Sequence, residues 1–156
     1  MLLSGTPASG TYQFRNIDSA VLQGVEAAAG WRGAGWTLQA QAGVLSARDG
    51  RGQWLEKRAR TTWGMRADWQ HGPWAAGGDV TTQSGLRLAS PQAGQPPQGV
   101  PRLTMVNLHA SLVLSPQITL RAGIDNATNL RLAAKSSLFS WEELPRNCRI
   151  GLEGRW

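Results

Sequence analysis

Hydrophobic and polar residues alternate along most of this chain, and that alternation restricts the folds that it can adopt. From Trp36 to Val44 the even positions are Trp, Leu, Ala, Ala and Val, and the odd positions are Thr, Gln, Gln and Gly. A period of two residues places successive side chains on opposite faces of a β-strand, whereas a helix requires a period near 3.6. Seven windows show the alternation: Ala20–Trp31, Trp36–Val44, Thr62–Trp69, Trp74–Gln83, Val106–Leu114, Ile118–Asp125 and Cys148–Trp156. The sequence therefore predicts an all-β chain, an antiparallel meander of about seven long strands. Leu22 and Gln23 interrupt the pattern of the first strand, and Leu2-Leu3 fits the end of an eighth.

The connections between these windows alternate between short and long. Short turns are expected at Arg32–Gly35, His71–Pro73 and Ser115–Gln117, and long polar or Gly/Pro-rich connections at Asp49–Lys57, Leu86–Arg102 and Ala127–Asn147. Short turns at one end and long loops at the other are typical of a bacterial outer-membrane barrel, in which the short turns face the periplasm.

Tryptophans gather at the strand ends that meet in the short turns. Trp31 and Trp36 flank the first turn, Trp69 and Trp74 flank the second, and Trp156 finishes the last window at the same end. All five share the parity of the apolar side, and indoles at one level form the aromatic girdle of a membrane barrel. The windows are also longer than the five or six residues of an average globular strand. We therefore expect the apolar side to face the lipid of the outer membrane.

The charged residues of these windows fall on the opposite side. The residues that we expect to face the lumen are Glu26, Arg66, Asp68, Asp79, His109, Arg121, Asp125, Arg149, Glu153 and Arg155. An arginine turned toward lipid costs roughly 2–4 kcal/mol near the bilayer midplane. The placement of these charges on one side therefore requires no functional role. Charges that pair across neighbouring strands of an ordinary barrel wall explain it.

Composition excludes several other classes of function. The single cysteine, Cys148, excludes an internal disulfide framework and a cysteine-based metal site. His71 and His109 have no zinc-ligand spacing, and no Ser/His/Asp set or nucleophile elbow is visible. No run of 18 apolar residues is present, so the sequence contains no transmembrane helix. We expect neither an enzyme nor a bound cofactor.

Two other binding functions are compatible with part of the sequence. A soluble β-sandwich or carbohydrate-binding module would also alternate, and it would place the tryptophans in a concave cluster. A nucleic-acid-binding sheet would use Arg and Trp, consistent with the net charge of +6. It would concentrate basic residues on one face, but Asp68, Asp79 and Asp125 share that face with the arginines. We therefore expect no nucleic-acid partner.

Several stretches of the chain are similar to one known family. They are Phe14–Ala20, Leu22–Glu26, Trp36–Gln39, Ala47–Asp49, Lys57–Arg60, Val106–Leu108, Leu120–Asn126 and Ile150–Trp156. Together they resemble the C-terminal part of TonB-dependent outer-membrane receptors, closest to the cobalamin and siderophore receptor group. The stretch Leu130–Arg146 matches nothing in that family.

The resemblance implies that the chain is the C-terminal portion of a 22-stranded barrel in a Gram-negative outer membrane. Residues 1–17 would supply a preceding strand end and an extracellular loop, and residues 18–156 the seven transmembrane strands. The family takes up a scarce metal chelate or a corrinoid, and TonB and a plug domain act only in an intact parent protein. Ile150, Leu152 and Trp156 resemble the C-terminal signal that barrel-assembly machinery reads. Since neither a secretion signal nor a plug is visible, we expect a truncated or split-gene product without transport activity of its own.

Overall fold

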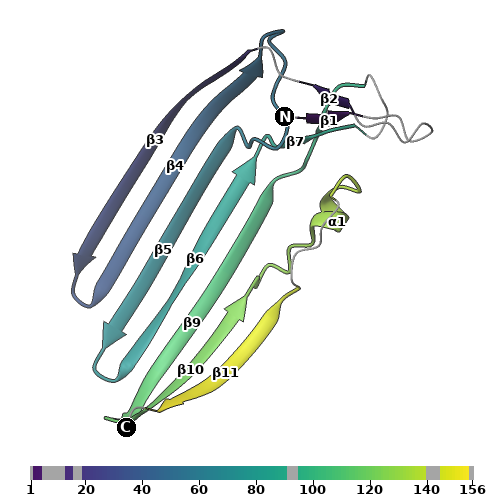
Figure 1. The fold of residues 1–156 in the computed structure, drawn as a ribbon. Helices are drawn as coiled ribbons and strands as arrows, with labels where there is room; N and C mark the ends of the chain where they lie inside the picture. Colours follow the sequence, from purple (N-terminus) through teal and green to yellow (C-terminus); the bar gives the residue numbers. More distant parts are fainter. Residues whose placement is uncertain (1, 5–12, 16–18, 91–94, 140–144, 155–156) are drawn as a thin grey trace.

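One long antiparallel sheet dominates the computed structural model, which describes residues 2–4, 13–15, 19–90, 95–139 and 145–154 (Figure 1). Its strands are β3 (Ala20–Gly33), β4 (Trp36–Asp49), β5 (Thr61–His71), β6 (Trp74–Ser84), β9 (Leu103–Ser115), β10 (Ile118–Asp125) and β11 (Asn147–Gly154). Their order in the sheet is β11-β10-β9-β6-β5-β4-β3, so each strand pairs with the one before it. The predicted meander of seven strands is confirmed.

The remaining elements are short and lie in the connections. β1 (Leu2–Ser4) pairs with β2 (Gln13–Arg15), so Leu2-Leu3 is a strand of a separate two-stranded sheet. β7 (Arg87–Leu88) pairs with β8 (Gln98–Gly99) inside the connection from β6 to β9. The helix α1 (Leu132–Lys135) is a single turn inside the connection from β10 to β11. No helix of the described residues has the length and hydropathy needed to cross a membrane.

The turn between β3 and β4 shows how the sequence sets the hairpins. Ala34 and Gly35 have φ values of 49° and 80°, and two successive residues with positive φ are typical of the tight turn whose twist suits a two-residue hairpin. Gly35 also lies directly against the Gln70 carbonyl of β5, where a Cβ would not fit. The backbone N–H of Gln70 donates to the Gly35 carbonyl over 2.8 Å, so a hydrogen bond joins the first turn to the next hairpin.

The buried apolar residues of the described chain gather at the long-loop end of the sheet. Leu103 and Met105 of β9 contact residues of the β6–β9 and β10–β11 connections. The cluster contains buried Leu88, Val100, Leu103, Leu130, Leu132 and Phe139, with partly buried Leu86, Met105 and Leu138 packed against it. Two long connections therefore pack on each other and on β9, and we call this set the loop cluster.

Candidate functional site

The strand register assigns each side chain of the sheet to one of two faces. Residues that lie opposite each other in a ladder point to the same side. One such row crosses four strands through Gln39, Arg66, Asp79 and Asn107. We call this side the polar face. Of the predicted lumen-facing residues, it carries Glu26, Arg66, Asp68, Asp79, His109, Arg121, Asp125, Arg149 and Glu153; Arg155 lies outside the described residues.

Ion pairs join many of these charges. Arg121 Nη2 lies 2.6 Å from Glu153 Oε2 across the β10–β11 ladder, and Arg149 Nη1 lies 3.0 Å from Asp125 Oδ2 across the same ladder. These side chains are well exposed, so each pair stabilises the fold by about 1 kcal/mol or less. The polar face thus largely neutralises its own charges, as expected of a barrel wall.

A second cluster of charges spans β5, β6 and β9. Arg66 Nε donates to Asp68 Oδ2 over 2.7 Å, and His109 Nε2 lies 2.9 Å from Asp68 Oδ1. Asp68 and His109 belong to different strands, and Gly77 of β6 lies between them in the register. A Cβ on Gly77 would lie 2.6 Å from Asp68 Oδ1 and 2.9 Å from His109 Cε1. The ion pair between Asp68 and His109 can cross β6 because Gly77 has no side chain.

Replacing Gly77 by alanine is therefore expected to destabilise the sheet by about 1–3 kcal/mol, the usual cost of an added methyl group with no room. The added Cβ would also lie 2.7 Å from the backbone oxygen of Ala67, which cannot turn away. Gly151→Ala is the matched control, because Gly151 lies on the same face and its Cβ would meet nothing within 4 Å. The midpoint of urea unfolding measures both variants, and equal midpoints would contradict the steric argument.

A chain of hydrogen bonds links the polar face to the loop cluster. Asn107 Nδ2 donates to Asp79 Oδ2 over 3.0 Å, and Asn107 Oδ1 accepts the backbone N–H of Asn126 over 3.0 Å. Asn126 Nδ2 then donates to the Leu130 carbonyl over 2.9 Å, and Asn126 Oδ1 accepts the Leu130 N–H over 2.7 Å. Asn126 is 4% exposed and has a φ of 52°, which asparagine tolerates better than most residues. The alternation of the strands does not single out these asparagines, although both lie in stretches that resemble the known family.

The opposite side of the sheet, the apolar face, is uncovered in the described residues. Its large side chains are far more exposed than a soluble core allows: Val25 75%, Val44 61%, Met65 57%, Ile150 78% and Leu152 71%. No second layer of the described chain packs on them. The soluble β-sandwich considered from the sequence needs such a layer, so the described fold gives that alternative no support.

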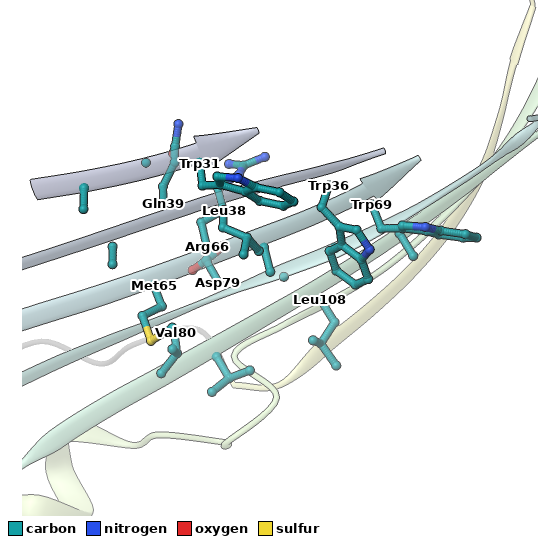
Figure 2. A pocket seen from close by; sticks show the side chains of 18 residues that line it. Trp31, Trp36, Leu38, Gln39, Met65, Arg66, Trp69, Asp79, Val80 and Leu108 are labelled. Carbon is teal, nitrogen blue, oxygen red and sulfur yellow. The ribbon is translucent and has the colours of Figure 1, made fainter. Parts of the chain in front are cut away.

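Four of the five predicted girdle tryptophans lie on the apolar face near the two short turns. Trp31, Trp36 and Trp74 are 54%, 42% and 54% exposed, and the rings of Trp36 and Trp69 lie 6.4 Å apart between centroids. Trp31, Trp36, Trp69 and Met65 line an open hollow of about 890 Å³. Figure 2 shows how these side chains lie. Trp156, the fifth girdle residue and part of the proposed C-terminal signal, lies outside the described residues.

Hydroxyl groups end the apolar face at the opposite, long-loop end. The hydroxyls of Thr61 and Ser84 hydrogen-bond to each other, and Thr82 Oγ1 lies 3.1 Å from Thr104 Oγ1 in the next ladder. Ser46 occupies the corresponding side of β4. We call these five residues the hydroxyl row. The apolar face is thus bounded by indoles at the short-turn end and by hydroxyls at the long-loop end.

The described residues contain no group of three or more His, Cys, Asp and Glu side chains that could hold a metal ion.

Comparisons with known proteins agree with this geometry. A family model described as TonB dependent receptor-like, beta-barrel, matches residues 2–127. A search of curated proteins finds no match.

Solved structures share the fold at low sequence identity. The ferripyoverdine receptor of the outer membrane of Pseudomonas aeruginosa superposes with a TM-score of 0.72 at 15% identity, over 86% of this chain and 19% of that one. The copper transporter OprC gives a TM-score of 0.71 at 15% identity, over 97% of this chain and 26% of that one. This chain therefore spans about a fifth to a quarter of the length of these neighbours. By its family match and its fold, it belongs to the TonB-dependent receptor β-barrel family.

Proposed function

We propose that the chain forms part of the barrel wall of an outer-membrane receptor that imports a metal chelate. The observation that carries this proposal is the position of the loop cluster, because Leu103 and Met105 lie on the polar face of β9. The two long connections consequently pack over the side that would face the lumen. Loops in that position suit the capture of a ligand from outside the cell.

The two faces of the sheet suit the two environments of a barrel wall. The apolar face would contact outer-membrane lipid, and the polar face would line the lumen beside a plug domain. β3 and β11 each have a partner on one side only within the described sheet, and an unpaired strand edge is costly in lipid. We propose that these edges pair with further strands of a 22-stranded barrel. The receptor would depend on TonB for energy, and barrel-assembly machinery would read the outward Ile150 and Leu152 of β11.

The proposed cargo is a metal chelate in preference to a corrinoid. The two neighbours named above are a receptor bound to ferripyoverdine and a copper transporter. The family is one of receptors, so we propose no catalytic step.

Cysteine labelling tests the orientation of the chain. With Cys148 replaced by serine, Ala89→Cys places a thiol in the β6–β9 connection and Gln117→Cys places one in the short turn before β10; both positions are exposed. In intact cells that export the chain through an added secretion signal, a membrane-impermeant maleimide should label the first variant and not the second. Labelling in the reverse order, or recovery in the soluble periplasm, would contradict the proposal.

Ligand titration tests the cargo separately. Tryptophan fluorescence of the refolded chain in detergent should fall saturably with ferripyoverdine and remain unchanged with cyanocobalamin. Free Cu²⁺ is a third probe, which distinguishes a chelate from the bare ion. Saturable binding of cyanocobalamin alone would reject the metal-chelate assignment and leave the barrel assignment intact.

A further inference from the structure

Arg48 is an exception to the charge parity of the sheet. It lies opposite Val21 in the β3–β4 ladder, on the apolar face. Every other Lys, Arg, Asp or Glu in the seven described sheet strands lies on the polar face. A charge on the apolar face is costly near the bilayer midplane and inexpensive at its interfaces. The level of Arg48 along the strand therefore decides what surrounds it.

The strand geometry puts Arg48 at the outer boundary of the apolar face. It follows Trp36 by twelve residues on the same strand, a distance of about 40 Å at about 3.4 Å per residue. A strand tilt near 45° reduces this to a height of about 28 Å, slightly more than the roughly 25 Å of a barrel's apolar band. On the same face of β4, Arg48 is also the next residue beyond Ser46 of the hydroxyl row, toward the long-loop end. It therefore reaches the headgroup level of the outer leaflet.

A second arginine and a tryptophan hold Arg48 in place. The guanidinium carbons of Arg48 and Arg60 each lie 4.3 Å from the ring centroid of Trp54, and Trp54 is bridged to Arg48 across the backbone. Arg48 Nη1 also donates to the Gly52 carbonyl over 2.8 Å. The stem of Arg60 lies on Gly85, where a Cβ would come within 2.8 Å of it. Both guanidiniums are thus ordered before any ligand arrives.

Neither guanidinium has a carboxylate partner within ion-pair distance among the described residues. The acid nearest to Arg48 in sequence, Asp49, uses Oδ1 to accept the backbone N–H groups of Arg51 and Gln53, at 2.9 and 2.8 Å. Two ordered, exposed guanidiniums without a counter-ion favour an anion from outside the protein. Their planar forks suit the paired oxygens of a phosphate group.

We propose that Arg48, Trp54 and Arg60 form a binding site for the phosphate groups of lipid headgroups in the outer leaflet. The occupant is a lipid because Arg48, and Trp54 bridged to it, continue the apolar face at headgroup level. The inference rests on the proposed function, since it requires this face to contact the membrane. The site would fix the height of the sheet in the bilayer and hold the β4–β5 connection at the surface.

Lipid binding tests the site directly. The refolded chain in detergent micelles is titrated with lipid A, which carries phosphate groups on a diglucosamine lipid, and with chemically dephosphorylated lipid A. Native mass spectrometry counts the bound lipid. Arg48→Gln is expected to weaken binding of phosphorylated lipid A by about tenfold or more, since a charge-assisted hydrogen bond contributes about 1.5–3 kcal/mol. Arg51→Gln is the matched control, because it removes the same charge three residues further along, in the adjoining β4–β5 connection, from an arginine that does not stack on Trp54.

Each outcome has a defined meaning. Equal losses in the two variants would show a diffuse charge effect and overturn the site, as would equal binding of both forms of lipid A. If millimolar inorganic phosphate binds as strongly as lipid A and displaces it, the site is one for a free anion, and the assignment to a lipid is overturned. Arg48→Lys keeps the charge and loses the fork, so it should bind with intermediate affinity. Circular dichroism confirms the sheet in every variant, and the orientation experiment above fails or succeeds independently of these results.

Discussion

Met65→Lys is expected to lower the free energy of unfolding of the membrane-inserted sheet by about 2–4 kcal/mol. Met65 lies on the apolar face, four residues from Trp69 at the girdle and four from Thr61 in the hydroxyl row. It is therefore near the middle of the apolar band, where an ammonium group has no water to solvate it. Lysine has nearly the length of methionine, so the substitution changes charge with little change of shape.

The control for this prediction places the same residue on the other face. Gln41→Lys lies on the polar face opposite Gly64, next to Met65 in the chain, and is expected to change stability by about 0.5 kcal/mol or less. Urea titration of the protein in lipid vesicles, followed by tryptophan fluorescence, measures both. Equal effects of the two lysines would contradict the assignment of the faces.

A third variant separates lipid from a packed protein interior. Ala40 lies opposite Met65 on the apolar face, and Ala40→Leu adds apolar volume there. Fluid lipid chains accommodate the larger side chain, whereas a close-packed interior would resist it at a cost of about 1–3 kcal/mol. A clear loss of stability in Ala40→Leu would show that another protein layer covers this face.

The strands were predictable because their alternation is a property of the backbone and needs no knowledge of the partners. β3 is continuous through Leu22 and Gln23, which place an apolar residue on the polar face and an amide on the apolar face. The ladder hydrogen bonds involve only main-chain groups, so two misplaced side chains do not interrupt it. The strand ends were less accurate, since β4 continues five residues past Val44 to Asp49. That extension carries Arg48, which lies beyond the alternating window Trp36–Val44.

The partners within the site could not be predicted, because they depend on register. Alternation assigned Asp68 and His109 to one side but gave no indication that Gly77 lets them meet across β6. The loop cluster was hidden for a related reason. Leu103 and Met105 have the parity of polar positions. Leu103 is buried and Met105 partly buried only because loops distant in sequence fold onto them. Such contacts leave no periodic signal in the chain.

Asn126→Ala is expected to release the β10–β11 connection from β9 while the sheet persists. The substitution leaves the N–H and the carbonyl of Leu130 without their Asn126 partners, and each unsatisfied buried group costs about 1–3 kcal/mol. Alanine also tolerates the φ of 52° less well than asparagine. Hydrogen exchange at the Leu130 amide should accelerate on the order of a hundredfold, the rate change for a local loss of about 2.8 kcal/mol.

Two further variants assign this effect to the buried hydrogen bonds. Asn129→Ala makes the same chemical change at a residue whose φ is also positive, 50°. Because Asn129 is exposed and its Oδ1 accepts a single 3.2 Å bond from the Arg146 N–H, a much smaller acceleration is expected. Asn126→Gly removes the backbone strain, since glycine adopts positive φ freely, and should retain most of the acceleration. Normal protection of Leu130 in the glycine variant would show that strain, and not the asparagine side chain, governs how firmly this loop is held over the polar face.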